Sequence, residues 1–389
     1  MSLLARSTLL VLSALLALAT PGSAGLGDKL KKKVQDKAAA KVEQVAGEEQ
    51  PAVPEAGEAP GESAEAGGAG PGDKVSEVST KFDFVPGDKV LFADDFTQDD
   101  LGEFPANWTL KQGTFEVAEM KGQRWLRSTS ITSDIRMKLP DMTALPEFWT
   151  LELDFYCGEP SGNVLTVYGM HGDQTVWNAV YPYSGTSCGF TTGDIFSNTP
   201  VEGPGPWGRV HHVMFMARGK AIKVYVDCQR VANVPEINPA PGAPDDISIT
   251  LWSDKQPMIT NVRFAEGCRP PKDMLAEGKL VTYGIHFASG SDVVLPESAP
   301  VLRQVATYMQ ANAAVKLRIT GHTDNVGQAD YNLDLSKSRA ASVAKILADE
   351  FGIAGDRFAT DGKGDTESVA SNAKAEGRAM NRRVEFAKM

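Results

Sequence analysis

Between about residues 81 and 271 the apolar and polar positions alternate in short runs, which is typical of β-strands. Residues 150–155 and 221–227 each place an apolar side chain at every second position, so one face of each strand would be buried. Glycine and proline residues separate these runs, and no long stretch shows the helical spacing of three or four. This pattern predicts an all-β sandwich or barrel over residues 81–271.

From residue 279 onward, strand-like and helix-like patterns take turns. Residues 281–287 and 315–320 alternate as strands, and residues 384–386 give a last short strand. Two helices are expected between them, one led by Pro296 and one that Ser336 caps and Gly352 stops. The order β-α-β-α-β within residues 279–389 predicts a compact α/β sandwich.

The first 24 residues have the pattern of a secretory signal peptide. Arg6 precedes an apolar run at residues 9–18, and the small residues Gly22 and Ala24 follow, so cleavage is expected after Ala24. The run is short for a bilayer span, which makes an uncleaved anchor helix the weaker alternative. The mature chain is therefore expected to be exported, with no transmembrane span.

Residues 25–80 are expected to hold a short charged helix followed by a tether. Apolar residues recur every four positions between Leu30 and Val42, which predicts a helix that is either solvated or lies on a membrane surface. Residues 51–72 are almost entirely Pro, Ala, Glu and Gly. Such a composition buries too little apolar surface to fold and predicts a disordered linker.

Composition narrows the class of protein further. A chain of 389 residues suggests two or three domains, and a formal net charge of −11 argues against a nucleic-acid partner. The four cysteines allow two disulfides in an exported protein, and all three pairings stay open. They lack a CxxC element, so a zinc site is not expected, and we expect no cofactor. The cysteines are Cys157, Cys188, Cys228 and Cys268.

Part of the β-rich region resembles the concanavalin-like (laminin-G-like) jelly-roll sandwich. The run Trp207 to Val213 and the later run Val224 to Asp227 follow the layout of two paired strands in that family, and residues 92–108 resemble its first strand. Cys228 stands where the family usually has glycine, so the turn at this point is expected to differ. The resemblance implies a sandwich that binds sugars or proteins in other members, but a fold alone does not assign a function.

The C-terminal region carries a longer set of motifs. Residues 321–327 read G-H-T-D-N-V-G, residues 332–347 follow the pattern N-x-x-L-S-x-x-R-A-x-x-V-x-x-x-L, and residues 377–386 read G-R-A-M-N-R-R-V-E-F. This ordered set is similar to the OmpA-like peptidoglycan-binding domain over nearly all of residues 279–389.

That resemblance implies non-covalent binding of peptidoglycan through the diaminopimelate residue of its stem peptide. The free end of diaminopimelate carries an ammonium and a carboxylate, so a site for it needs an acid and a base. By the resemblance, Asp324 would hold the ammonium. Arg339, expected in the first turn of its helix, would hold the carboxylate with help from the helix N-terminus. Asn332, Leu333 and Arg382 would line the same pocket.

Some residues have a simpler explanation. Taken alone, Asp324 and Arg339 would be an ordinary salt bridge; the surrounding motif is what favours binding. Arg383 is expected to pair with a nearby acid, and His322 to be a packed or turn residue. Residues 288–290 read Ala-Ser-Gly where many family members place Asp, Thr and Asn. A polar ligand contact from this loop would therefore come from its serine or from backbone amides.

No catalytic motif stands out, and we expect a binding protein rather than an enzyme. Paired carboxylates in the sandwich, either Asp94 with Asp95 or Glu152 with Asp154, would suit glycoside hydrolysis. Glu152 and Asp154 lie two apart on one strand, and a solvated strand face explains them better. His211 and His212 are interpreted as strand residues.

The chain is thus expected to be an envelope protein of the periplasm or outer membrane that is associated with peptidoglycan. Its sandwich would bind a second carbohydrate or protein ligand or serve a structural role. The alternative is an envelope lectin or glycoside hydrolase, in which the sandwich carries the activity and the C-terminal domain localises it.

Overall fold

The computed structural model describes residues 74–389, except residues 141, 163, 184–185, 204, 239, 241 and 268. The expected signal peptide, the charged helix and the linker at residues 51–72 lie outside the described residues. Within the described part of the chain, no helix is long and apolar enough to cross a membrane.

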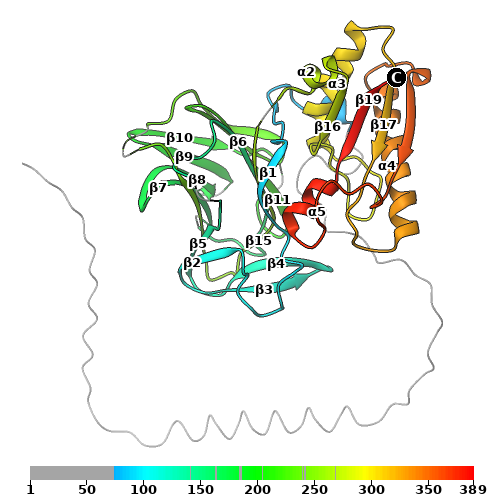
Figure 1. Ribbon diagram of the computed structural model, residues 1–389. Coiled ribbons are helices and arrows are strands. Elements are labelled where there is room, and N and C mark those ends of the chain that lie inside the picture. Colours follow the sequence, from blue (N-terminus) through cyan, green and yellow to red (C-terminus); the bar gives the residue numbers. More distant parts are fainter. Residues whose placement is uncertain are drawn as a thin grey trace, which may run out of the picture. The chain divides into compact units, whose positions relative to one another are not determined.

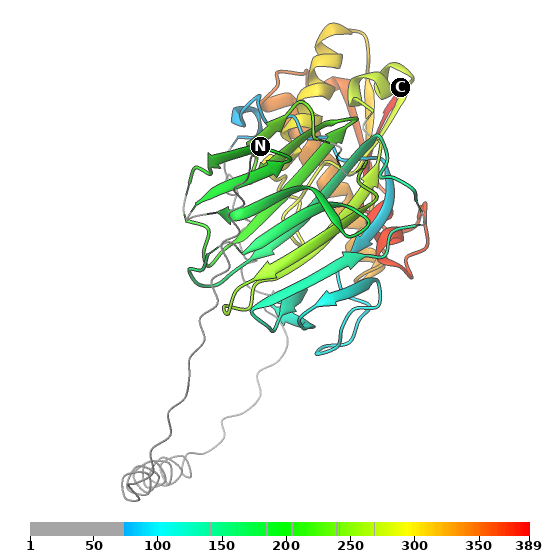
Figure 2. The same cartoon turned by 90° about the vertical axis from the view of Figure 1, so that its left-hand side faces the viewer.

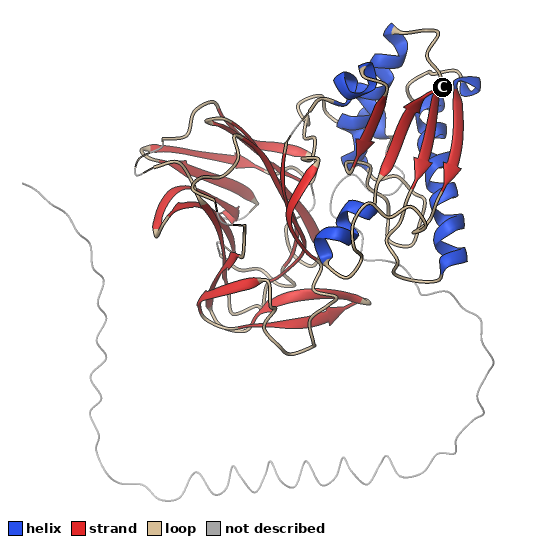
Figure 3. Cartoon of the chain, in the orientation of Figure 1, coloured by secondary structure: helices blue, strands red, loops and turns tan. Residues whose placement is uncertain are grey.

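The region predicted to be all-β forms strands and loops throughout residues 89–266 as far as they are described (Figure 3). The strands are β1 (Lys89–Asp94), β2 (Trp108–Gln112), β3 (Phe115–Met120), β4 (Gln123–Ser128), β5 (Thr132–Met137), β6 (Phe148–Tyr156), β7 (Leu165–His171), β8 (Gln174–Tyr183), β9 (Ser187–Thr192), β10 (Ile195–Pro200), β11 (Val210–Arg218), β12 (Ala221–Val226), β13 (Gln229–Val234), β14 (Asp246–Trp252) and β15 (Met258–Glu266).

These strands make two antiparallel sheets that face each other (Figure 1). The first has the order β13-β12-β11-β6-β15-β4-β3, and β1 joins it by pairing with β15. The second, which Figure 2 presents face on, has the order β10-β9-β8-β7-β14-β5-β2. The two facing sheets confirm the prediction of an all-β sandwich, without specifying its class.

Alternation along the strands places one set of side chains between the sheets. Leu151, Leu153 and Phe155 of β6 are fully buried in this core. The ring of Trp177 on β8 lies 5.8 Å from that of Phe215 on β11, so aromatic side chains from both sheets meet there. Contact between the inward faces is what holds two antiparallel sheets together in a sandwich.

The turn between β12 and β13 keeps the backbone conformation that glycine favours. Asp227 and Cys228 have φ values of 48° and 65°, the left-handed region that two-residue hairpin turns require. Cys228 therefore adopts a backbone conformation that glycine takes more readily.

Two expectations for the sandwich are wrong. Glu152 is only 3% exposed rather than solvated, and its Oε1 accepts a hydrogen bond of 2.9 Å from Arg263. The three described cysteines, Cys157, Cys188 and Cys228, are free thiols. Since two disulfides among four cysteines would join at least two of these three, that scheme is not formed.

Beyond the sandwich the chain forms a mixed sheet with helices. The elements are α2 (Pro271–Ala276), β16 (Lys279–Thr282), α3 (Ala299–Ala311), β17 (Leu317–Gly321), α4 (Ala329–Asp349), β18 (Phe358–Gly362), α5 (Ala375–Asn381) and β19 (Val384–Lys388). Short 3-10 turns lie at Val75–Glu77, Pro296–Ser298 and Gly355–Arg357. The sheet order is β16-β19-β17-β18, in which only β17 and β18 run parallel.

Helices α3 and α4 cover one face of this sheet. Leu317 and Ile319 on β17 point into the same core as Val305 of α3 and Val343 of α4, whereas Arg318 between them is exposed. Alternation along β17 therefore sets which face receives the helices.

The expected order β-α-β-α-β is incomplete, because it omits β18 and α5. The prediction that Ser336 caps a helix is also wrong. Helix α4 begins at Ala329, and Ser336 is a buried interior residue whose hydroxyl donates to the carbonyl of Leu333 and accepts from the amide of Gly364. Serine can satisfy its hydroxyl within a helix in this way. At the other end Gly352 (φ 70°) follows the helix, as expected.

Candidate functional site

Asp324 lies in the loop that leaves β17, and the backbone holds it in place. The amides of His322 and Thr323 donate to the carbonyls of Arg383 and Gly364. Asp324 itself is 7% exposed. Its Oδ1 accepts a hydrogen bond of 3.0 Å from the amide of Val326, and its Oδ2 accepts one of 2.6 Å from Nη1 of Arg382. One carboxylate oxygen thus orders the loop, and the other is shared with an exposed arginine.

Arg339 projects from α4 and is oriented by two contacts that leave its terminal nitrogens free. Its Nε donates a hydrogen bond of 2.9 Å to the carbonyl of Ser291, and its guanidinium carbon lies 4.8 Å from the centre of the Phe287 ring. Neither terminal nitrogen has a partner among the described residues. A guanidinium fixed at Nε presents its two terminal amino groups as a planar fork suited to a carboxylate.

The acid and the base belong to one site without neutralising each other. Asn332 of α4 holds the Asp324 loop through a hydrogen bond to the Asp324 carbonyl, and Arg339 follows about two turns later on the same face of that helix. Burial lowers the pKa of Arg339, while the charge of Asp324 acts in the opposite direction. The structure records no ion pair between them among the described residues. An anion and a cation that lie near each other but are not paired with one another can bind a ligand carrying both charges on one carbon.

Asn332 and Leu333, two of the expected pocket residues, lie beside the loops that carry Asp324 and Gly364. Asn332 is 3% exposed, and its Nδ2 donates to the carbonyls of Asp324 and Val326 at 3.3 and 3.0 Å. It therefore holds the loop that carries Asp324. Leu333 is half-buried, and its backbone runs close to Gly364, where an added Cβ would lie 3.0 Å from the Leu333 nitrogen.

The expectation that Arg339 lies in the first turn of its helix is wrong. Because α4 begins at Ala329, Arg339 lies about three turns into the helix. The free amides of the first turn therefore do not reach a carboxylate held by Arg339.

The loop at residues 288–291 serves the site through its backbone. The carbonyl of Gly290 accepts a hydrogen bond of 2.8 Å from the Tyr331 hydroxyl, and that of Ser291 accepts from Arg339. These contacts do not depend on which side chains the loop carries, so the Ala-Ser-Gly sequence keeps them. The expected structural pair is also present, since Nε of Arg383 donates to Glu385 at 2.9 Å. His322 is packed, with 3% exposure.

Arg378 and Asp95 were not predicted, and both join the network around Arg382. Nη2 of the buried Arg378 donates to Oδ1 of Asp95 at 2.6 Å and to the Thr97 hydroxyl at 2.7 Å. Arg382 lies 3.7 Å from the other oxygen of Asp95. The arginines stand in the 377–386 motif, which could have marked Arg378. The sequence marks Asp95 only as the neighbour of Asp94 and gives no sign that it contacts these arginines.

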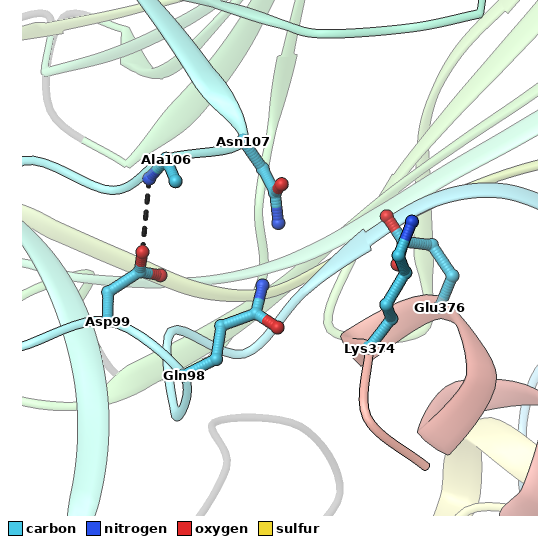
Figure 4. A pocket seen from close by; sticks show the side chains of 6 residues that line it. All are labelled: Gln98, Asp99, Ala106, Asn107, Lys374 and Glu376. Atoms are coloured by element: carbon cyan, nitrogen blue, oxygen red, sulfur yellow. Dashed lines mark hydrogen bonds between the residues drawn. The ribbon is translucent and has the colours of Figure 1, made fainter. Parts of the chain in front are cut away.

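A polar cavity of about 350 Å³ adjoins this network (Figure 4). On one side lie Asp99, which accepts a hydrogen bond from the amide of Ala106, and the amide side chains of Gln98 and Asn107. On the other side are Lys374 and Glu376 at the start of α5. Among the described residues, no group of three or more His, Cys, Asp or Glu side chains is placed to hold a metal ion.

The mixed sheet with its helices and the nearby acid and base define the class of domain that the C-terminal motifs predicted, and comparison with known proteins agrees with it. The model of the OmpA family matches residues 286–382, so the C-terminal part of the chain contains an OmpA family domain, as its motifs predicted.

Particular relatives match over this region. The chain is 40% identical over 146 residues to the peptidoglycan-binding protein ArfA of Mycobacterium bovis, which covers 35% of this chain and 44% of that protein. It is 37% identical over 121 residues to outer membrane porin F of Pseudomonas aeruginosa, covering 31% and 33%. The crystal structure of the peptidoglycan-associated lipoprotein from Burkholderia pseudomallei is 26% identical over 31% of this chain and all of that chain, with a TM-score of 0.27. The chain thus spans between a third and a half of the length of these two curated relatives.

Proposed function

We propose that this protein is a non-enzymatic envelope protein that binds peptidoglycan through the free end of diaminopimelate. The observation that carries the proposal is that, among the described residues, Asp324 and Arg339 form no ion pair with each other and the two terminal nitrogens of Arg339 have no hydrogen-bond partner. A protein that needed these residues only for stability would gain more by pairing them, because half-buried terminal nitrogens without hydrogen-bond partners are costly.

Each charge of the ligand has a matching group in the site. The carboxylate of diaminopimelate accepts two hydrogen bonds from the fork of Arg339, and its ammonium donates to Oδ2 of Asp324. Arg382 already donates to that oxygen, so the ligand ammonium competes with Arg382 for it. Asn332 keeps the Asp324 loop in position, and Leu333 and Arg382 border the site.

The relatives support this chemistry and suggest where the protein acts. One of the matching proteins is named as peptidoglycan-binding and another as an outer membrane porin. Together with the signal-peptide pattern of residues 1–24, these names support our proposal that the protein acts in the periplasm, at peptidoglycan near the outer membrane. The linker at residues 51–72 would then separate the folded part from whatever the N-terminal segment contacts.

For the sandwich we propose the concanavalin-like (laminin-G-like) class and a second ligand. A cavity of about 390 Å³ is lined by Ile131, Trp252 and Asp254 among others, and Trp252 is 57% exposed. An exposed indole beside hydroxyl and carboxylate groups suits a sugar ring, which favours the lectin alternative over a hydrolase. Hydrolysis by Glu152 is disfavoured because Arg263 holds that carboxylate in a buried pair.

Sedimentation with purified diaminopimelate-type peptidoglycan sacculi tests the proposal. The full chain should pellet with sacculi, whereas folded Asp324→Ala and Arg339→Ala variants should stay in the supernatant. Removing one partner of a charge-assisted contact costs about 2–5 kcal/mol, enough to abolish sedimentation. Arg318→Ala is the matched control, because Arg318 is exposed on the open face of β17. Full binding by both site variants would refute the assignment.

A further inference from the structure

The sandwich places one carboxylate against the arginines of the C-terminal site. Asp95 follows directly after β1, and β1 is in contact with α5. Oδ1 of Asp95 is saturated, since it accepts from Arg378, from the Thr97 hydroxyl and from the Thr97 amide. Oδ2 has no hydrogen bond among the described residues and lies 3.7 Å from Nη1 of Arg382.

The turn that carries Asp95 is held by buried groups. Oδ1 of Asp94 accepts the amide of Phe96 at 2.9 Å, and its Oδ2 accepts the indole N–H of Trp108 at 3.0 Å. Phe96 is fully buried with a φ of 57°. A buried non-glycine residue in this backbone region persists only where its surroundings fix it. The Asp95 side chain is therefore preorganised toward α5.

Asp95 stays ionised in this position. Burial opposes its charge, but the hydrogen bonds from Arg378 and Thr97 and the charges of Arg378 and Arg382 outweigh that effect and hold the pKa of Asp95 below its usual range. Two carboxylates thus lie within 4 Å of the same terminal nitrogen of Arg382, Nη1. Asp324 holds it at 2.6 Å, and Asp95 stands 3.7 Å away with an oxygen that accepts no hydrogen bond from the described part of the chain.

We propose that Asp95 is a positioning residue of the peptidoglycan site and receives Arg382 when the ligand binds. This inference rests on the proposed function. The ligand ammonium and the Arg382 guanidinium cannot both occupy Oδ2 of Asp324 without repelling each other. A small movement of the exposed Arg382 side chain onto Oδ2 of Asp95 removes that conflict and keeps the arginine paired. The sandwich thereby lowers the cost of opening the Asp324 pair.

The test measures binding of the full chain to purified diaminopimelate-type sacculi. Asp95→Asn keeps the shape and the hydrogen-bond acceptor for Arg378 but removes the charge that attracts Arg382. It should weaken binding about fivefold, the value of a partly exposed ion pair at the upper end of its range. Asp100→Asn, the same change at an exposed position in the following loop, should leave binding unchanged.

A double-mutant cycle separates positioning from simple structural support. In an Arg382→Gln background, Asp95→Asn should have no further effect on binding, because the group it positions is absent. Equal binding of Asp95→Asn and the native chain, or the same loss with and without Arg382, would overturn the inference. Failure of the native chain to bind sacculi would instead overturn the proposed function. Thermal unfolding of each variant monitors, separately from binding, the stability that the contact between Arg378 and residue 95 contributes.

Discussion

Replacing Arg339 by lysine isolates the contribution of the guanidinium fork. The substitution keeps the positive charge but removes the Nε–H that donates to the Ser291 carbonyl and the planar group that lies 4.8 Å from the Phe287 ring. An ammonium on a flexible chain then offers a ligand carboxylate one contact where the fork offers two. We expect Arg339→Lys to fold and to bind weakly.

The size of the loss follows from the number of hydrogen bonds. Hydrogen bonds to charged groups contribute roughly 1.5–3 kcal/mol each, so the loss of one from a bidentate pair amounts to about 2 kcal/mol. That corresponds to about a 30-fold rise in Kd. Calorimetric titration of the full chain with a soluble stem peptide that contains diaminopimelate measures this directly.

The control for this experiment is Arg318→Lys, the same substitution on the exposed face of β17. It should leave Kd unchanged. If Arg339→Lys bound the peptide as tightly as the native chain, Arg339 would contribute only its charge, and the bidentate arrangement inferred from its free terminal nitrogens would be wrong.

Three further predictions concern stability, each measured by urea unfolding. Gly377→Ala should destabilise the fold by about 1–3 kcal/mol, because the new Cβ would lie 1.9 Å from the Ser371 carbonyl oxygen. The control Gly355→Ala should be nearly neutral, because a Cβ at Gly355 would meet no atom within 4 Å. Asn332→Ala should cost about 1–3 kcal/mol through the loss of both loop hydrogen bonds, whereas Asn325→Ala at an exposed position should not. Lowering the pH should reduce the free energy of unfolding of the native chain more than that of Glu152→Gln. Burial opposes the charge of Glu152, but His212 and Arg263 outweigh burial and hold the pKa of Glu152 at about 2, below the ordinary 4.5.

The sign of the last prediction follows from proton binding. A carboxyl group whose pKa is lowered by folding stabilises the native state above pH 4.5, and that contribution, roughly 3 kcal/mol, disappears as the pH falls toward 2. Glutamine cannot titrate, so the variant should lose less stability between pH 5 and pH 3. Equal losses of stability in the native chain and in Glu152→Gln would contradict the lowered pKa of Glu152. Equal stabilities of the two glycine variants would contradict the predicted clash at Gly377, and equal stabilities of the two asparagine variants would contradict the role of Asn332.

Much of the fold follows from local patterns in the sequence. The alternation in β17 fixes which side chains are buried, and that in β6 fixes which ones enter the core between the sheets. The C-terminal motifs identified the OmpA family domain that the comparison confirmed. Ser336 misled the prediction because a hydroxyl that could cap a helix can equally bond within one. Glu152 did so because its position in an alternating strand does not reveal that Arg263, 111 residues away, neutralises it.

The site was predictable only in part, for a related reason. Asp324 and Arg339 stand in motifs that read along the chain, so the resemblance could assign them. Their orientation comes from Ser291 and Phe287, which lie in another loop and carry no distinctive pattern. Asp95 is separated from Arg378 by 283 residues, and only the folded chain brings the two together.

The central claim is that the site binds both charges at the free end of diaminopimelate, and one comparison tests it most directly. Two soluble stem peptides that differ only in carrying diaminopimelate or lysine present the same ammonium, but only the first presents the carboxylate. We expect the full chain to bind the diaminopimelate peptide at least about 30-fold more tightly, the value of one to two charge-assisted hydrogen bonds. This preference should disappear in Arg339→Ala. Equal affinity of the native chain for both peptides would contradict the account.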